Sequence, residues 1–452
     1  MSPVMRTSRV VRGTPQPARA RLCAAIAAVL LASGCASVGP SVRPHRHASA
    51  AVATRPPAPI AAPSSPAAAP SPTLSASAEV EPPDVSSARV TSSATVLHWG
   101  SFFGDQPGVN YDQSTTPAAL TLPGLVIQVG TSNSTQYALL SNGSLYAWGL
   151  GNEGQLGDGL RHNSFAPVRV RFPPGVRIAW IPTDAMPYDT ALAVDSQGNV
   201  WGWGGNGGGE LCLGNTRSYG RPVELPLANV TSVAGASNHA LYDADRTVYA
   251  CGQNLAGVLG DGSTRNSSRP ARVAGINGAS VIQLVSSFAN AGALLFGGAY
   301  YDWGYDGAGQ LGDGSVGRSS DVPVRVPLPG PVTQVAQGGS IWNNGQTLVL
   351  LANNTTWAWG AGGAGQLGDG VRAAQPWPGQ FRPPPGVTYQ SLATGSATSY
   401  AVSTARDVYA WGVSFTGQVG DGLTRAAHAP VLIASGASSI SSTANDVVIA
   451  EQ

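Results

Sequence analysis

Residues 137–159 read YALLSNGSLYAWGLGNEGQLGDG, and this stretch decides the fold. Two runs of strand-forming residues, Tyr137 to Leu140 and Leu145 to Trp148, flank the turn Ser141 to Ser144. The Asn-Gly pair inside this turn is a strong β-hairpin signal, because both residues adopt positive φ readily. The glycine-rich motif Gly154 to Gly159 follows a few residues later. The stretch therefore predicts a β-hairpin followed by a tight glycine loop.

Both motifs recur along the chain at intervals near fifty residues, which is the signature of a propeller or a solenoid. The Trp-Gly pair returns at Trp99, Trp148, Trp203, Trp303, Trp359 and Trp411, with Cys251-Gly252 in the missing slot. The glycine motif returns at Gly257 to Gly262, Gly309 to Gly314, Gly365 to Gly370 and Gly417 to Gly422, with the variant GELCLG at Gly209 to Gly214.

The strands around each hairpin predict the architecture. An apolar run such as Leu125 to Val129 precedes each hairpin, and a Pro-led run such as Pro167 to Val170 follows each glycine motif, so each unit has about four strands. Val447 to Ala450 is a first half-hairpin without a second, and Thr95 to Gly100 is a second half without a first. We expect the two to pair, because pairing removes exposed sheet edges. Residues 95–452 are thus predicted to form an all-β, seven-bladed β-propeller closed by N- and C-terminal strands that share one blade.

The first 35 residues resemble a bacterial lipoprotein signal peptide. Five arginines precede the apolar run Leu22 to Ala32, which ends on Ser33-Gly34-Cys35, so Cys35 is the expected lipidation site. An ordinary signal peptide with an incidental cysteine is the alternative. Residues 36–94 are rich in Ala, Pro and Ser and are expected to form a disordered tether. The resemblance, with Ala36 rather than Asp after the cysteine, implies an outer-membrane lipoprotein of the bacterial cell envelope, periplasmic or surface-exposed.

The charge of the chain argues against nucleic acid as a partner. All 25 basic residues are Arg, and without the five in the signal segment 20 remain against 24 acidic residues. A mature chain of that sign has no general attraction for a polyanion.

The spaced Trp-Gly pairs, the GQLGDG loops and the trailing Pro-Val pattern resemble the repeat of the regulator-of-chromosome-condensation family over nearly all of residues 95–452. The resemblance implies a seven-bladed propeller. Secreted bacterial relatives that inhibit β-lactamases imply a protein target. The family's nucleotide exchange on small GTPases is also implied, but it needs cytosolic access that a secretion signal denies.

Two groups of side chains are candidates for binding. One arginine follows each of six glycine loops and could bind an acidic partner or a glycan, or could tie its loop to a neighbouring carbonyl or Asp: Arg161, Arg217, Arg265, Arg318, Arg372 and Arg425. Large aromatic side chains interrupt the loops that precede the hairpins at Tyr188, Phe288 and Trp342. They are either interface anchors or inward-facing fillers between blades.

Other polar residues are assigned structural roles. The Asp of each Gly-Asp-Gly is expected to bond its own turn backbone. Cys212 and Cys251 lie in consecutive units and form either a disulfide or two buried thiols. The sequence shows no catalytic pattern, cofactor motif or metal-ligand spacing. We therefore predict a non-enzymatic, envelope-anchored scaffold that binds a protein through one propeller face, with glycan binding as the alternative.

Overall fold

The computed structural model describes residues 95–102, 112–132, 135–182, 186–340, 344–443 and 446–451. The predicted signal peptide with Cys35, the predicted tether and Trp342 all lie outside the described residues.

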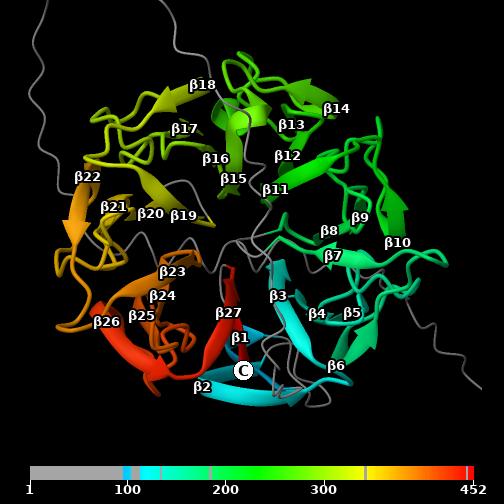
Figure 1. Ribbon diagram of the computed structural model, residues 1–452, viewed down its shortest axis with the longest axis horizontal. Helices are drawn as coiled ribbons and strands as arrows, with labels where there is room; N and C mark the ends of the chain where they lie inside the picture. The colour runs from blue at the N-terminus through cyan, green and yellow to red at the C-terminus, as the bar shows by residue number, and fades with distance from the viewer. Residues whose placement is uncertain are drawn as a thin grey trace, which may run out of the picture. The chain divides into compact units, whose positions relative to one another are not determined.

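Seven four-stranded antiparallel sheets are arranged as blades around a ring (Figure 1). Blades 1 and 2 contain β3 (Val126–Ser132), β4 (Thr135–Leu140), β5 (Leu145–Gly149), β6 (Ser164–Arg169), and β7 (Ile178–Trp180), β8 (Thr190–Asp195), β9 (Val200–Gly204), β10 (Tyr219–Glu224). Blades 3 and 4 contain β11 (Val230–Ala236), β12 (His239–Ala244), β13 (Thr247–Gly252), β14 (Ser267–Arg272), and β15 (Val281–Ser286), β16 (Asn290–Leu295), β17 (Tyr300–Gly304), β18 (Ser320–Arg325). Two short 3-10 helices accompany them, η2 (Leu255–Gly257) and η3 (Gly278–Ser280).

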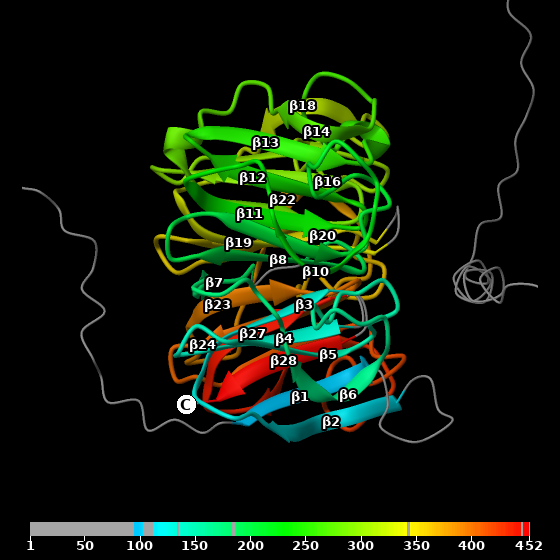
Figure 2. The ribbon, with the colours of Figure 1, turned by 90° about the vertical axis from the view of Figure 1, so that its right-hand side faces the viewer.

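Blades 5 and 6 contain β19 (Val332–Gly338), β20 (Gln346–Leu351), β21 (Thr356–Gly360), β22 (Gln375–Phe381), and β23 (Tyr389–Thr394), β24 (Thr398–Ser403), β25 (Val408–Gly412), β26 (Ala427–Ala434). Blade 7 combines both ends of the chain in β27 (Ala437–Ser442), β28 (Asp446–Glu451), β1 (Thr95–Phe102) and β2 (Asp112–Thr121). The first strand of each blade lies nearest the centre of the ring and the fourth lies at its periphery (Figure 1). Seen from the side, strands of successive blades lie above one another (Figure 2).

Blade 7 closes the ring as the sequence predicts. β1 pairs antiparallel with β28, with Val96 opposite Ala450 and Gly100 opposite Asp446. β27, the inner strand of this blade, packs against β3 of blade 1. The predicted all-β, seven-bladed architecture and its closure are therefore confirmed.

The two sequence motifs meet at the junctions between blades. The indole Nε1 of a Trp-Gly pair donates a hydrogen bond of 2.8–3.0 Å to a backbone carbonyl in the glycine loop of the preceding blade. The donor and acceptor pairs are Trp203 and Gln155, Trp303 and Val258, Trp359 and Gln310, Trp411 and Gln366, and Trp99 and Gln418. The same indoles lie in the apolar clusters that fill the junctions, for example Trp303 against Leu259 and Leu284. The recurring Trp-Gly pair thus joins each of these blades to the preceding one.

The second glycine of the motif is required by this contact. Gly157 has φ of +69°, and a Cβ added to it would lie 2.7 Å from Nε1 of Trp203. The equivalent distances at the other four junctions are 2.6–2.8 Å. A side chain at this position would therefore displace the indole.

The junction between blades 2 and 3 replaces both partners at once. Cys212 occupies the position of the second glycine in the variant motif, and Cys251 occupies the position of the tryptophan. The two form a disulfide with Cα atoms 5.4 Å apart, which decides between the two possibilities left open by the sequence. A covalent bond thus stands where five other junctions use an indole hydrogen bond.

Candidate binding face

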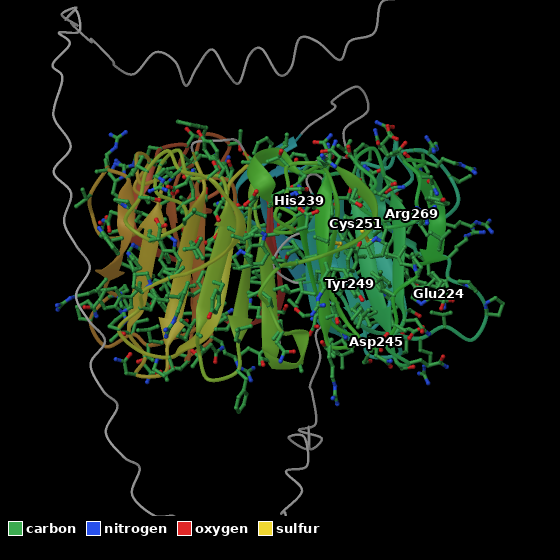
Figure 3. The ribbon with its side chains drawn as sticks, turned by 90° about the horizontal axis from the view of Figure 1, so that it is seen from above. Glu224, His239, Asp245, Tyr249, Cys251 and Arg269 are labelled. Carbon is green, nitrogen blue, oxygen red and sulfur yellow. A yellow bond between two sulfur atoms is a disulfide. The ribbon has the colours of Figure 1, made fainter. Side chains whose placement is uncertain are left out.

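The connections between strands define two faces of the ring. The loops between first and second strands and the glycine loops between third and fourth strands lie together on one face, which we call the loop face. The tight turns between second and third strands lie on the opposite face, the hairpin face. Figure 3 shows His239 and Arg269 toward the loop face and Asp245 toward the hairpin face. All predicted binding residues that the structure describes therefore belong to the loop face.

The aspartates of the glycine motifs stabilise their own turns, which confirms the prediction. In five loops the carboxylate Oδ1 accepts a bond of 2.8–3.0 Å from the backbone N–H two residues later, at Asp158, Asp261, Asp313, Asp369 and Asp421. At Asp158 burial favours a higher pKa, but hydrogen bonds from His162 and Leu160 outweigh it, so the pKa lies below the usual value. The five carboxylates therefore accept hydrogen bonds from the backbone of their own loops.

The six arginines of the loop face are exposed, and they divide into two groups. The Nη1 atom of Arg161 lies 3.9 Å from the carboxylate Oε2 of Glu153. The guanidinium carbon of Arg217 lies over the ring of Tyr219, 6.0 Å from its centroid. The Nε–H of Arg372 donates to the carbonyl of Gly363 at 3.1 Å. The guanidinium groups of Arg265, Arg318 and Arg425 make no hydrogen bond or ion pair with any residue that the structure describes. Half of the ring is therefore tied to local structure, and half is presented to solvent.

Exposed apolar side chains accompany four of these arginines, a feature that the sequence reasoning missed. Leu160, Val316, Val371 and Leu423 follow their Gly-Asp-Gly segments, and 40–59% of each is exposed. Each lies one or two residues before an arginine, which gives four pairs that we call the rim pairs: Leu160 and Arg161, Val316 and Arg318, Val371 and Arg372, and Leu423 and Arg425. An apolar residue directly after three of the glycine motifs was the available signal.

The two described aromatic candidates lie in loops that cover the centre of the loop face. The phenol of Tyr188 in blade 2 donates to the carbonyl of Ser340 in blade 5 at 3.2 Å, which links opposite sides of the ring (Figure 1). Burial raises the pKa of Tyr188 to about 12. The backbone N–H of Phe288 donates to the carbonyl of Gly339, also in blade 5. These contacts show how the loops are held, while the binding role of the aromatics stays a prediction.

A serine and a histidine also meet in this part of the ring. Nε2 of His239 lies 2.8 Å from the hydroxyl of Ser286, and both side chains are 1% exposed. Burial lowers the pKa of His239 to about 3. A general base needs access to substrate and a pKa near the working pH, so this pair has neither property of a catalytic dyad.

Within the residues that the structure describes, no group of three or more His, Cys, Asp or Glu side chains is arranged to hold a metal ion. In the same ranges, no helix combines the length and apolar character needed to cross a bilayer.

The geometry defines a closed propeller whose repeated motifs build the blade junctions. The family model described as the regulator of chromosome condensation (RCC1) repeat matches residues 142–182 and 298–341. Each match begins in the turn of one blade and ends at or just after the inner strand of the next. Two segments of the chain therefore match the RCC1 repeat, and the described residues fold as a seven-bladed propeller.

Known proteins resemble most of the propeller. The ultraviolet-B receptor UVR8 of Arabidopsis thaliana is 28% identical over 347 residues, which cover 74% of this chain and 77% of the receptor. The E3 ubiquitin-protein ligase HERC2 of Mus musculus is 27% identical over 78% of this chain, but the match spans only 7% of the ligase.

Solved structures agree on the fold. Prp20p of Saccharomyces cerevisiae superimposes with a TM-score of 0.68 and 20% identity, covering 80% of this chain and 92% of Prp20p. Human WBSCR16 gives a TM-score of 0.67 with 19% identity over 79% of this chain and 98% of its own.

Proposed function

We propose that this protein is a non-enzymatic scaffold that binds a protein partner through the loop face, held at a bacterial cell envelope by a lipid on Cys35. The rim pairs carry the proposal. Arginine is enriched at binding hot spots, and an exposed apolar side chain beside it adds area that a partner can bury. A partner that presents carboxylates next to apolar side chains fits this pattern.

Blades 4 to 6 make the strongest contribution to this surface. Arg318 and Arg425 have no described ion-pair partner to exchange for a new one. Trp377 and Phe415, in the same blades, are 56% and 60% exposed. The indole of Trp377 lies over Gly314, where a Cβ would not fit. Guanidinium and apolar groups from consecutive blades thus lie on one side of the ring.

Similar proteins support a binding role. Prp20p has described binding properties toward Gsp1p and histones, and it has also been solved bound to Kap60. The present chain shares its fold. Since one fold serves many functions, the shared propeller makes a protein partner an expectation that the capture experiment below has to test.

The disulfide supports the proposed compartment. The bond between Cys212 and Cys251 suits an oxidising environment such as a periplasm or a cell surface. Fractionation of intact cells, followed by mass spectrometry of the N-terminal peptide that begins at Cys35, tests the anchor. A soluble, unlipidated peptide would contradict this part of the proposal.

The binding proposal is tested by crosslinking and affinity capture from envelope extracts with the full chain as bait. A rim variant replaces three apolar residues by Ser and their arginines by Gln, at Val316, Arg318, Val371, Arg372, Leu423 and Arg425. A matched hairpin-face variant carries Ile127→Ser, Ile282→Ser and Arg406→Gln, which alter residues of similar type and exposure.

We expect one or a few proteins to be captured by the wild type and the hairpin-face variant. The rim variant should lose at least about tenfold of that binding while it keeps its thermal unfolding midpoint. Equal capture by all three proteins, or loss only in the hairpin-face variant, would contradict a binding site on the loop face.

Glycan binding is a second candidate because of the exposed indole of Trp377. Aromatic faces stack on apolar faces of sugar rings. A glycan array with the wild type and Trp377→Ala separates the two functions. Signals that disappear in this variant support glycan binding, whereas an array without signals removes this candidate.

A further inference from the structure

A pocket of about 530 Å³ lies on the hairpin face between blades 3 and 4, opposite the rim pairs. Its lining comes from β11 and the residue before it, β12, the following turn, η3 and β15, through Asn229, Thr231, Asp243, Asp245, Arg246, Gly278, Ala279 and Val281. It has no part in the proposed function.

A shortened turn accounts for the pocket. The turn between β12 and β13 has two residues, Asp245 and Arg246, whereas the corresponding turn of blade 1 has four, at 141–144. In blade 1 the carbonyl of Gly143 reaches the next blade and accepts from the N–H of Ile178 at 3.3 Å. The shorter turn of blade 3 meets η3 instead, because a Cβ added to Gly278 would lie 2.4 Å from the carbonyl carbon of Arg246 and 2.4 Å from Oδ1 of Asp243. The 3-10 helix η3 packs beside it, and the pocket remains.

Asp243 departs from the repeat at the same place. The equivalent position of the second strand is apolar in the six other blades, as Leu139, Val194, Leu294, Leu350, Val402 and Ala450. Asp243 is 2% exposed, and its Oδ2 accepts from the hydroxyl of Thr231 at 2.7 Å. Its Oδ1 is buried and has no hydrogen-bond partner in the described part of the chain.

An aspartate at this buried position lowers the stability of the fold. A buried carboxylate oxygen without a donor destabilises a fold, and an apolar side chain here would not. Burial also raises the pKa of Asp243, although the bond from Thr231 opposes this. Departures from a local rule that lower stability concentrate at functional sites. The unpaired oxygen beneath a pocket therefore indicates a donor that arrives with a ligand.

The other polar groups of the pocket restrict the kind of donor. The carboxylate of Asp245 accepts from the amide of Asn229 at 2.6 Å and adds a second negative charge beside Asp243. The exposed guanidinium of Arg246 balances only one of the two. The volume is typical of a site for a small organic group. Among the residues described, no set of metal ligands is assembled here.

We propose that this pocket binds a guanidinium group, which donates several hydrogen bonds in one plane and pairs with carboxylates in a fork. The group can belong to a free small molecule or to an arginine side chain of a partner. The carboxylates of Asp243 and Asp245 are its acceptors.

Isothermal titration calorimetry with the full chain tests the proposal. Agmatine represents the free source, and a capped Ala-Arg-Ala peptide represents the side-chain source. Tetramethylammonium, a cation without N–H donors, and calcium chloride are control ligands. Asp243→Asn removes the charge at constant shape, and Asp243→Leu restores the apolar residue of the repeat. Asp407→Asn is the matched control, because Asp407 is an acid of a hairpin-face turn in blade 6 that accepts from Ser435.

We expect saturable binding of agmatine, of the peptide, or of both. That binding should weaken about tenfold or more in Asp243→Asn, disappear in Asp243→Leu and stay unchanged in Asp407→Asn. A thermal midpoint of Asp243→Leu at or above the wild-type value excludes misfolding as the cause. The proposal is overturned if neither guanidinium probe binds at millimolar concentration. Equal binding of tetramethylammonium, preference for calcium, or binding unaffected by Asp243→Asn overturns it as well.

Discussion

The junction between blades 2 and 3 should accept the tryptophan and glycine of the other junctions in place of its disulfide, but only as a pair. Cys251→Trp alone breaks the disulfide and places an indole against the side chain of Cys212. Cys212→Gly with Cys251→Trp removes that obstruction, so the indole can donate to the carbonyl of Glu210, as Trp203 does to Gln155.

The magnitudes follow from the structure. The disulfide joins residues 39 positions apart, which corresponds to about 4 kcal/mol of stabilisation in the chain-entropy model. In five other junctions a Cβ on the glycine would come within 2.6–2.8 Å of the indole nitrogen. Overpacking of this kind costs about 1–3 kcal/mol. Cys251→Trp should therefore be the least stable protein, and the added Cys212→Gly should recover about 1–3 kcal/mol.

Thermal and urea unfolding, with and without a reducing agent, measure these differences. The wild type should unfold at a lower midpoint once it is reduced, whereas the double variant should be insensitive to reductant. Cys212→Gly alone completes the double-mutant cycle and isolates the coupling between the two positions. Additive effects of the two substitutions, or a wild type that is indifferent to reduction, would refute the reasoning.

Three further changes test other parts of the fold. Burial raises the pKa of Asp302 well above its usual value, so the folded state loses stability as the pH rises. Asp302→Asn removes this ionisation and keeps an acceptor for Gln337. The variant should therefore have a higher thermal midpoint than the wild type at pH 8 and nearly the same midpoint at pH 4. A lower midpoint at pH 8 would contradict this. Gly157→Ala should lower the free energy of unfolding in urea by about 1–3 kcal/mol. Gly175→Ala should lower it less, because Gly175 also has positive φ but has open space around it. Equal losses in the two variants would show that the contact with the indole is unimportant. Tyr188→Phe should cost about 0.5–1.5 kcal/mol by the same measurement, since it loses one bond across the ring, and no change would mean that the loops are held by other contacts.

The blades and the closure of the ring could be predicted because their signals are local. An Asn-Gly turn, a Trp-Gly pair and a glycine loop each report the conformation of a few adjacent residues, and their period reports the number of units. The unmatched half-hairpins at Val447 to Ala450 and Thr95 to Gly100 indicated their own pairing, which β1 and β28 confirm. The roles of the turn aspartates were predictable for the same reason.

The candidate sites depended on contacts between residues far apart in the chain. The disulfide, the bond from Tyr188 to blade 5, and the pocket above Asp243 each join segments that only the closed ring brings together. Local sequence sets the hydrogen-bonding of a turn or a strand, but burial and the absence of a donor are properties of the surrounding blades. The amino-acid sequence therefore specified the repeated blades. The packing of neighbouring blades determined where departures from the repeat form a disulfide, a contact between loops or a pocket.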